Sequence, residues 1–382
     1  MLNKTSREFN ILEKYISKSH LNKSDSYIIN TLTNLAEEIN NKNLTYFGGY
    51  ALKKTFEDSI TKNKRFKEYI KKNEAINNIN IPDPIFIMGM PRSGTTYIHN
   101  LIIKSTDYEG LKFWELCEPI PYYQNKKKDI LIRKLKTNVI YYLFKIFVSN
   151  IQKMHPVWVN SYEECWHLFK LNMNIYNLDF QLGLNFFGDY ILKENGYQAY
   201  NDYALLLKII TFDKENKKLV LKCPEHFLFT NHLKKIFPKS KFIWMHRDPG
   251  KTICSYSKMI YEVQKFYYGK KNIKKSEVAN FVKNKFYKML KTGLKIRDKN
   301  EDDFIDVNYI NLINDTKHTL NYISSKCDFD IKNINLLKMR NKKLNKLKNK
   351  TNYSLDEFNL NRTDINDLFK NYLKKFDIKI EY

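Results

Sequence analysis

The sequence predicts an α/β fold, a three-layer, P-loop-type parallel sheet flanked by helices. Two observations carry this prediction. Short apolar segments alternate with longer amphipathic ones after residue 81, and the first apolar segment runs directly into a loop of small residues and a helix start. Strands that alternate with helices are typical of a parallel sheet with right-handed crossovers. The chain has 382 residues, 43% of them hydrophobic, which suffices for one large domain with additions.

Residues 1–80 are polar and rich in lysine, and apolar residues recur at helical spacing in places. We predict a helical N-terminal extension of two or three helices there. Pro82 and Pro84 stop any helix before the first strand. The main domain is expected to span 81–382 and to end in a helical C-terminal addition. The last helix of this addition should place five apolar residues on one face: Ile365, Leu368, Phe369, Tyr372 and Phe376.

Four strands are predicted, at 85–89, 217–222, 241–245 and 303–308, with helices at 226–237, 250–265 and 273–296. The basic segment 129–153 is also predicted to be a helix, and its apolar run 139–148 is expected to be buried. That run contains Lys145 and is too short to cross a bilayer. A position on a membrane surface is the less favoured alternative for it.

The charge balance is strongly basic, with 66 Lys and Arg against 41 Asp and Glu and a net charge of +25. Such a charge suggests nucleic acid or membrane surfaces as partners. The lysines are scattered along the whole chain, however, and no RNA- or DNA-reading motif accompanies them. We therefore interpret the charge as a solvated surface with local use at a polyanionic ligand. We expect no nucleic-acid partner, and peripheral membrane contact stays open.

The cysteines are odd in number and too far apart in the sequence to suggest a metal site. Reduced, structural thiols are the expected state. The N-terminal residues contain no apolar run resembling a signal peptide. The sequence therefore predicts a cytoplasmic protein without a transmembrane segment. The five cysteines are Cys117, Cys165, Cys223, Cys254 and Cys327.

The first predicted strand leads into a candidate anion site, because a strand, a small-residue loop and a helix N-terminus form an anion cradle. Gly89 and Gly94 have the spacing of a phosphate-binding loop, but Thr95 and Thr96 replace its lysine and Ser/Thr. That lysine reaches the β- and γ-phosphates of a nucleoside triphosphate. Here the nearby cation is Arg92, inside the loop, so we predict a phosphate-like ligand but not ordinary ATP chemistry. The candidate ligand-binding residues are Arg92, Ser93, Gly94, Thr95, Thr96 and Tyr97.

Three segments in strand context carry a family resemblance. The first is 91–96 (PRSGTT), the second is 221–227 (LKCPEHF), and the third is 237–249 (FPKSKFIWMHRDP), which continues to Ser255. Together they resemble the PAPS-dependent sulfotransferases, closest to the broad tyrosylprotein and carbohydrate group. PAPS is 3′-phosphoadenosine 5′-phosphosulfate. The resemblance runs from residue 82 to residue 376 and leaves the first 80 residues uncovered.

The resemblance implies PAPS as the sulfuryl donor and assigns roles to the motif residues. The first motif would hold the 5′-phosphosulfate, with Arg92 as a bidentate clamp. Arg247 and Ser255 would bind the 3′-phosphate, and Lys222 would stabilise the bridging oxygen as it leaves. A sulfonate carries one fewer negative charge than a terminal phosphate, so no metal is expected.

The general base is open between several residues. An acceptor hydroxyl or amine must lose a proton near the transition state, which calls for a carboxylate or histidine within reach. Glu115 is the first candidate, because tyrosylprotein-type sulfotransferases carry a catalytic glutamate close to this place. His226 is the second, because cytosolic small-molecule sulfotransferases carry a histidine shortly after the equivalent strand. Glu164 is a third candidate, although Glu163 and Glu164 are first interpreted as charges at a helix N-terminus.

The predicted function is transfer of a sulfuryl group from PAPS to a hydroxyl or amine, in line and most simply on a small-molecule acceptor. Catalysis of this kind rests on positioning and electrostatic stabilisation. One alternative is a kinase or NTPase with a degenerate P-loop. The other is a non-catalytic protein that binds a nucleotide or polyanion. Neither the acceptor nor the oligomeric state follows from the sequence.

Overall fold

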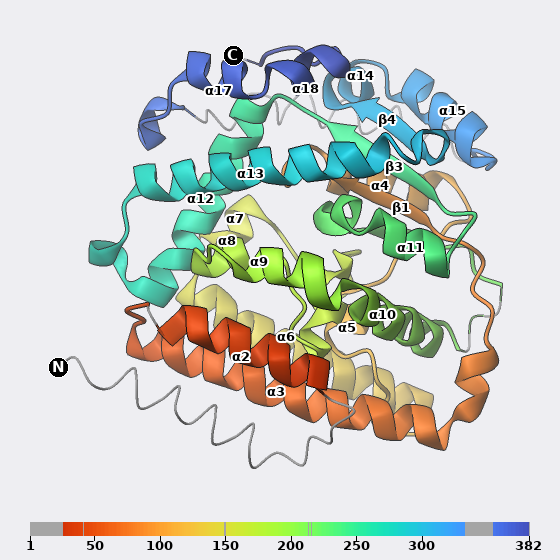
Figure 1. Ribbon diagram of the computed structural model, residues 1–382. Helices are drawn as coiled ribbons and strands as arrows, with labels where there is room; N and C mark the ends of the chain where they lie inside the picture. Colours follow the sequence, from red (N-terminus) through yellow and green to blue (C-terminus); the bar gives the residue numbers. More distant parts are fainter. Residues whose placement is uncertain are drawn as a thin grey trace.

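The computed structural model describes residues 26–40, 42–148, 150–212, 214, 216–332 and 354–381, and it has the predicted α/β architecture (Figure 1). Within these residues the centre is a four-stranded parallel sheet in the order β2-β1-β3-β4. The strands are β1 (Ile85–Gly89), β2 (Val220–Lys222), β3 (Lys241–His246) and β4 (Phe304–Asn308). The four predicted strands are confirmed, but β2 is shorter than predicted because Leu219 forms only an isolated bridge with Glu109.

Strands β1 and β3 are buried on both sides, as central strands of a parallel sheet are. Along β1, Phe86 and Met88 face one apolar cluster, and Ile85 and Ile87 face another. Because successive side chains of a strand point to opposite faces, this run needs a helical layer on each side. The sequence of apolar residues without polar interruption therefore explains the three layers.

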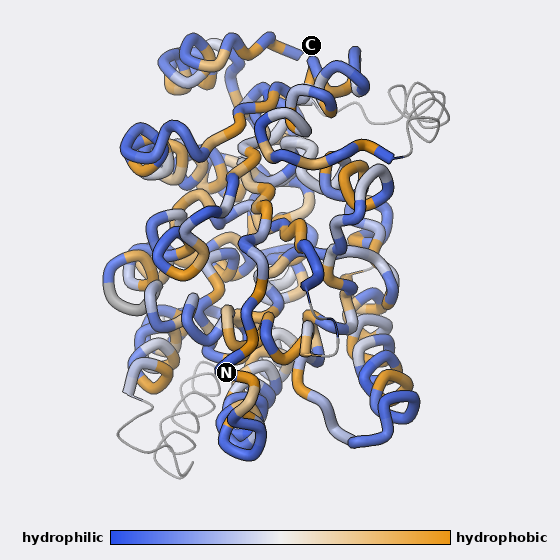
Figure 2. The backbone as a smooth tube through the Cα atoms, turned by 90° about the vertical axis from the view of Figure 1, so that its right-hand side faces the viewer, coloured by the Kyte–Doolittle hydropathy of each residue, from blue (hydrophilic) through white to orange (hydrophobic). Residues whose placement is uncertain are grey.

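Helices cover both faces of the sheet. One face carries α4 (Thr95–Ser105), α14 (Tyr309–Asn314) and α15 (Thr316–Cys327), and the other carries α10 (Gly196–Thr211), α11 (Thr230–Ile236), α12 (Pro249–Tyr268) and α13 (Lys275–Arg297). Figure 2 shows hydrophobic segments running through the middle of the molecule. The predicted helix at 226–237 is wrong in its first part, where the 3-10 turn η5 (Pro224–Leu228) precedes α11. Phe227 in η5 is fully buried and stacks on Trp244 at 4.9 Å, so tertiary packing determines this turn.

The N-terminal part of the chain packs onto the same large apolar cluster. It contains α2 (Ser26–Asn40), α3 (Tyr46–Lys72) and the 3-10 turn η2 (Glu74–Asn78), and residues 1–25 lie outside the described residues. Ile28 and Leu32 of α2 and Phe56 of α3 are fully buried in that cluster. The Thr45 N–H donates to the Tyr267 carbonyl at 2.7 Å, which ties α3 to the end of α12. The domain boundary at residue 80 stays a prediction.

The middle of the chain is mostly helical, as predicted. Its elements are α5 (Phe113–Cys117), α6 (Lys126–Phe147), α7 (Ile151–Met154), η3 (Cys165–Leu171), α8 (Leu178–Leu182), α9 (Phe187–Tyr190) and η4 (Ile191–Asn195). The predicted single helix at 129–153 is two helices, α6 and α7. The prediction that 139–148 is buried is wrong, because α6 turns polar residues toward the protein and exposes its apolar ones, among them Val139, Ile140 and Leu143.

The C-terminal part closes the molecule on the side away from α2 and α3 (Figure 1). It contains η8 (Asp356–Phe358), α17 (Arg362–Leu368) and α18 (Lys370–Lys375), whereas the short turns η6 (Lys270–Asn272) and η7 (Glu301–Asp303) precede α13 and β4. Four of the five apolar residues predicted for the last helix are buried: Ile365, Phe369, Tyr372 and Phe376. The helix is divided at Phe369 into α17 and α18. The five cysteines form no disulfide in the structure.

Candidate functional site

The candidate site lies where β1, β2 and β3 end, at the carboxyl edge of the sheet. From β1 the chain crosses to β2 on one side and then to β3 on the other, so this edge is a topological switch point. Ligands of open α/β sheets bind at such points. Three loops leave the edge together: the predicted anion loop after Gly89, the turn after Lys222 and the turn that begins at Arg247.

The anion loop requires glycine at both ends. Gly89 has φ 135°, and a Cβ there would lie 2.5 Å from the Met245 carbonyl oxygen. Gly94 has φ 101°, and a Cβ there would lie 2.6 Å from the Tyr309 ring. Arg92 has φ 72°, a left-handed conformation that costs a non-glycine residue about 1–3 kcal/mol. The loop therefore has a strained backbone conformation at Arg92, which the surrounding structure must stabilise.

The loop ends as an anion cradle at the N-terminus of α4. Gly94 is the N-cap of this helix and supplies no side-chain cap, so the first-turn N–H groups of Thr95 and Thr96 point out of the helix. Among the described residues, the buried hydroxyl of Ser93 has no hydrogen-bond partner. N–H groups, a helix dipole and a hydroxyl without a partner together suit a tetrahedral anion. The residues present therefore fit a phosphate or sulfonate group.

The structure brings the first and third motifs into contact. Arg92 Nε donates to Ser255 Oγ on α12 at 3.0 Å, and Arg247 Nη1 donates to the Arg92 carbonyl at 3.2 Å. The Arg247 guanidinium also lies 3.9 Å from the centre of the Tyr309 ring. Two arginines and a serine from distant parts of the sequence thus share one side of the loop. Tyr97 points elsewhere, with its hydroxyl 3.4 Å from Thr316 Oγ1 on α15.

A carboxylate from the C-terminal segment is bound to Arg247. Glu381 accepts from Arg247 Nε and Nη2, each at 2.8 Å, in a bidentate pair. Burial would lower the pKa of Arg247, but the Glu381 carboxylate outweighs burial and raises the pKa above its ordinary value. Asp248 fixes this segment, because it accepts from the Glu381 N–H at 3.0 Å and from Arg362 at 2.9 Å. No local pattern in the sequence predicts this role of Glu381.

Lys222 forms a second cationic centre beside the loop. Its side chain is fully buried, and Nζ lies 3.1 Å from Thr96 Oγ1 and 3.3 Å from both Glu163 and Glu164. Burial alone would lower the pKa of Lys222, but the two carboxylates outweigh it and raise the pKa above its ordinary value. Lys222 is therefore an ammonium ion at neutral pH. Glu164 is the N-cap residue of η3, in line with the predicted position at a helix N-terminus, but its side chain makes no capping hydrogen bond, and both carboxylates pair with this lysine.

The two carboxylates differ in their surroundings. Glu163 is buried and also lies 3.2 Å from His155 Nε2. Burial would raise its pKa, but Lys222 and His155 hold the pKa of Glu163 well below its ordinary range. Glu164 has a partly exposed side chain, and among the described residues its Oε1 contacts Lys222. Of the two, Glu164 is the carboxylate that an incoming molecule can reach.

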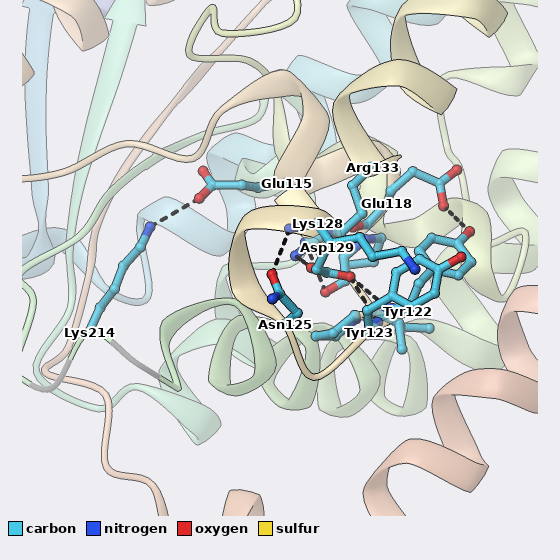
Figure 3. Close-up of polar contacts among 12 residues, drawn as sticks. Glu115, Glu118, Tyr122, Tyr123, Asn125, Lys128, Asp129, Arg133 and Lys214 are labelled. Atoms are coloured by element: carbon cyan, nitrogen blue, oxygen red, sulfur yellow. Dashed lines mark hydrogen bonds and ion pairs between the residues drawn. The ribbon is translucent and has the colours of Figure 1, made fainter. Parts of the chain in front are cut away.

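Glu115 has other partners. Its Oε2 accepts from the Lys112 N–H at 2.8 Å, and its Oε1 pairs with Lys214 Nζ at 3.0 Å. Figure 3 shows the Glu115 side chain pointing to Lys214 and away from the polar cluster around Arg133. No contact of Glu115 with the anion loop or Lys222 is present among the described residues.

His226 is fully buried inside a group of aromatic rings. Its Nδ1 lies 2.8 Å from the Tyr200 hydroxyl, and its ring packs edge-on against Phe86 at 5.4 Å. Burial lowers the pKa of His226 to about 3. Its Nε2 is also buried and has no partner among the described residues. His226 is thus neutral and enclosed.

A small cavity lies beside the turn that follows Lys222. Its volume is about 20 Å³, and burial raises the pKa of Glu225 in its wall to about 7. Cys223 Sγ donates to Glu225 Oε2 at 2.8 Å. Aromatic residues supply much of the remaining wall: Trp166, Phe169, Tyr176, Tyr200 and Phe229. Across the described ranges, no group of three or more His, Cys, Asp or Glu residues could hold a metal ion.

Comparisons with known proteins identify relatives. Residues 84–333 match the model of the family described as "Sulfotransferase family". The crystal structure of sulfotransferase STF9 from Mycobacterium avium is similar with a TM-score of 0.76 and 19% identity, covering 100% of this chain and 99% of that one. Sulfotransferase STF1 from Mycobacterium tuberculosis H37Rv gives 0.74 and 17%, covering 96% and 98%. At these identities the two structures show a shared fold. No curated protein matches the chain.

Proposed function

The chain belongs to the sulfotransferase family, and we propose that it transfers a sulfuryl group from PAPS to a hydroxyl or amine of a small-molecule acceptor in the cytoplasm. One observation carries the proposal. A loop without the lysine of a nucleoside triphosphate site lies at one sheet edge with three cations, Arg92, Lys222 and Arg247. A metal-free transfer needs such cations because charge spreads over the equatorial oxygens in the transition state.

For the donor, we propose that Arg92 and the N–H groups of Thr95 and Thr96 hold the 5′-phosphosulfate. The hydroxyl of Ser93 lacks a partner among the described residues and would donate to the same group. Arg247 and Ser255 would hold the 3′-phosphate, and the carboxylate now paired with Arg247 supports this assignment because it has the charge and planar fork that a phosphate edge would match. PAPS supplies the activated sulfuryl group.

For the acceptor, we propose Glu164 as the general base and Lys222 as the cation at the leaving oxygen. Lys222 contacts Thr96 at the head of α4 and Glu164 on its other side, so one ammonium ion connects the donor cradle to a reachable carboxylate. Glu163 would orient Lys222, since Lys222 and His155 keep it ionised. Glu115 and His226 remain the alternatives. Glu115 pairs with Lys214, and aromatic rings enclose His226.

The proposal is tested by calorimetric titration with adenosine 3′,5′-bisphosphate in buffer that contains a metal chelator. We expect binding, and we expect Arg247→Ala to weaken it by about 10- to 100-fold, the effect of losing charged hydrogen bonds to a phosphate. Lys299→Ala, at an exposed lysine in the turn after α13, serves as the matched control and should bind as the wild type does.

Transfer itself is tested with radiolabelled PAPS and a set of phenols, alcohols and amines. Labelled product that depends on Arg92 and needs no magnesium supports the proposal. Binding of the bisphosphate without transfer to any acceptor would favour a nucleotide-binding protein. Magnesium-dependent hydrolysis of ATP would favour a degenerate P-loop NTPase and overturn the donor assignment.

A further inference from the structure

Helix α6 exposes its apolar side to the solvent. Leu131, Leu135, Val139 and Ile146 recur at helical spacing and are each half-exposed or more, with Leu131 at 65%. An amphipathic helix of a globular protein normally turns such a stripe to the core. Here the buried positions are polar instead: Asp129, Arg133 and Thr137.

The inward polar residues fix the rotation of α6 about its axis. Arg133 donates to Asp129 Oδ2 at 3.1 Å and to the carbonyls of Glu118 and Pro119. Asp129 Oδ1 in turn accepts from the Tyr122 N–H at 2.6 Å. Figure 3 shows this cluster gathered on one side of the helix. Because buried charges without their partners are costly, the helix cannot turn its apolar stripe inward.

The exposed apolar surface continues onto the start of α3. Phe47 is 59% exposed, and its ring lies 5.7 Å from that of Phe147 at the end of α6. We call the whole surface the α6 face, and we define it by its exposed residues: Tyr46, Phe47, Tyr50, Leu131, Leu135, Val139, Ile140, Tyr142, Leu143, Ile146 and Phe147. A contiguous apolar patch on this scale marks an interaction site rather than a normal monomer surface.

Lysines border the α6 face. Helix α6 contains six lysines, and its one acidic residue is the buried Asp129, which Arg133 pairs. Lys134 and Lys145 fall on one side of the apolar stripe and Lys136 on the other, by their helical positions. Near the far end of the face, Glu262 is paired with Lys265 at 2.7 Å. An apolar stripe bordered by lysines is the pattern of helices that lie in a membrane interface.

We propose that the α6 face docks on a membrane surface that contains anionic lipids. The apolar residues would enter the acyl boundary, and the bordering lysines would lie among the headgroups. A second copy of the chain fits less well, because the same lysines would meet each other and each copy carries a net charge of +25. Among the described residues no helix is long and apolar enough to cross a membrane.

The contact network connects the α6 face with the candidate site. Tyr141 of α6 donates to Gln152 of α7 at 2.9 Å, and the segment after α7 supplies His155, which lies against Glu163. Docking would therefore bring the membrane to the side of the molecule that holds Glu163 and the proposed base Glu164. The docking proposal does not depend on the sulfuryl-transfer chemistry, and its test needs neither donor nor acceptor.

The test is co-sedimentation of the full chain with sucrose-loaded vesicles. One set contains phosphatidylcholine alone, and the other contains about one third phosphatidylglycerol, enough for a strongly negative surface potential. We expect binding to the anionic vesicles, with a partition coefficient at least about ten-fold above that for the neutral set. We also expect that binding to fall as the salt concentration rises.

Two variants and their controls separate the contributions. The triple variant Leu135→Ser, Val139→Ser, Ile146→Ser should lower the partition coefficient about ten-fold or more, since it removes three buried side chains from the bound state. Its control changes three exposed aromatic residues outside the face: Phe186→Ser, Phe212→Ser and Tyr322→Ser. Charge reversal at Lys127 and Lys136 to Glu should lower the partition coefficient on anionic vesicles about ten-fold or more. The same reversal at Lys299 and Lys326 is the control, and the logarithm of its partition coefficient should fall by less than half as much.

Several results would overturn the proposal. Equal binding to both vesicle sets, or equal loss in the triple variant and its control, excludes the α6 face as the anionic-membrane contact. Sedimentation velocity of the chain without lipid tests whether a second copy of the chain binds the α6 face instead. A dimer that the triple variant dissociates, together with absent vesicle binding, assigns the face to a second copy. Circular dichroism of each variant verifies its fold, and these substitutions lie on exposed positions that tolerate serine.

Discussion

The sheet edge and the α6 face differ in whether their characteristic side chains, charged at the edge and apolar on α6, have partners within the molecule. At the edge, two cations have partners inside the molecule: Glu381 pairs with the partly exposed Arg247, and Glu163 and Glu164 pair with the buried Lys222. On α6, the buried polar residues are satisfied inside, and the apolar residues contact solvent. The charged groups of the edge are thus paired within the molecule, whereas the apolar residues of the α6 face are left uncovered among the described residues.

The largest effect is expected at Lys222, whose loss breaks the edge. Lys222→Ala leaves two carboxylates near each other without their cation, so we expect unfolding free energy to fall by about 3–5 kcal/mol. Transfer should fall about 100- to 1,000-fold because the developing charge loses its cation. Chemical denaturation and initial rates measure the two effects.

A compensated variant distinguishes the two roles of Lys222. Lys222→Met combined with Glu163→Gln removes the fully buried ion pair and keeps Glu164, the proposed base, so much of the stability should return while transfer stays as low as in Lys222→Ala. If the compensated variant recovers transfer as well, Lys222 has only a structural role.

The second effect concerns the choice of base. Glu164→Gln should lower transfer by about 100-fold or more, the scale of general base catalysis, and leave bisphosphate binding unchanged. Glu115→Gln and His226→Ala are the matched comparisons, measured with the same acceptor. A larger loss in either of them, with Glu164→Gln near the wild-type rate, would return the role to the original candidates.

How much the sequence could predict differs between these regions for a physical reason. The strand Ile85–Gly89, its loop and the helix that follows are contiguous, so local pattern sufficed to predict them. The proximity of Glu163 to Lys222 arises because the segment around Tyr162 bridges to Lys112, a tertiary pairing without a local signal. The contact of Glu381 with Arg247 likewise joins the last residues to the middle of the chain.

For α6 the sequence correctly predicts a helix from its apolar periodicity, but the prediction that its apolar run is buried is wrong. Periodicity says which residues share a face, but the direction of that face depends on what its neighbours offer. Here the carbonyl oxygens of Glu118 and Pro119 accept hydrogen bonds from Arg133. The polar side was therefore buried and the apolar side exposed.

The third prediction sharpens the comparison on α6 alone. Arg133→Met should cost about 2–3 kcal/mol of unfolding free energy, because several hydrogen bonds to a buried charged group are lost and Asp129 is left unpaired. Leu135→Ser on the opposite side should change it by about 0.5 kcal/mol or less. Denaturant unfolding of the two variants tests this. The reverse order would mean that the apolar side is covered in solution.

The smallest effect is expected at Glu381, whose carboxylate pairs with the guanidinium that we propose binds the 3′-phosphate. Glu381 neutralises Arg247 in the bidentate geometry proposed for the 3′-phosphate, so donor and carboxylate compete for one guanidinium. Glu381→Gln removes the competing charge and should tighten binding of adenosine 3′,5′-bisphosphate by about ten-fold, the scale of a charge-assisted hydrogen bond. The exposed Asp377→Asn is the control, because it removes a nearby charge outside this pair. Unchanged or weaker binding in Glu381→Gln would mean that the carboxylate supports Arg247 instead of competing with the donor, and the 3′-phosphate would then have to bind elsewhere on the edge.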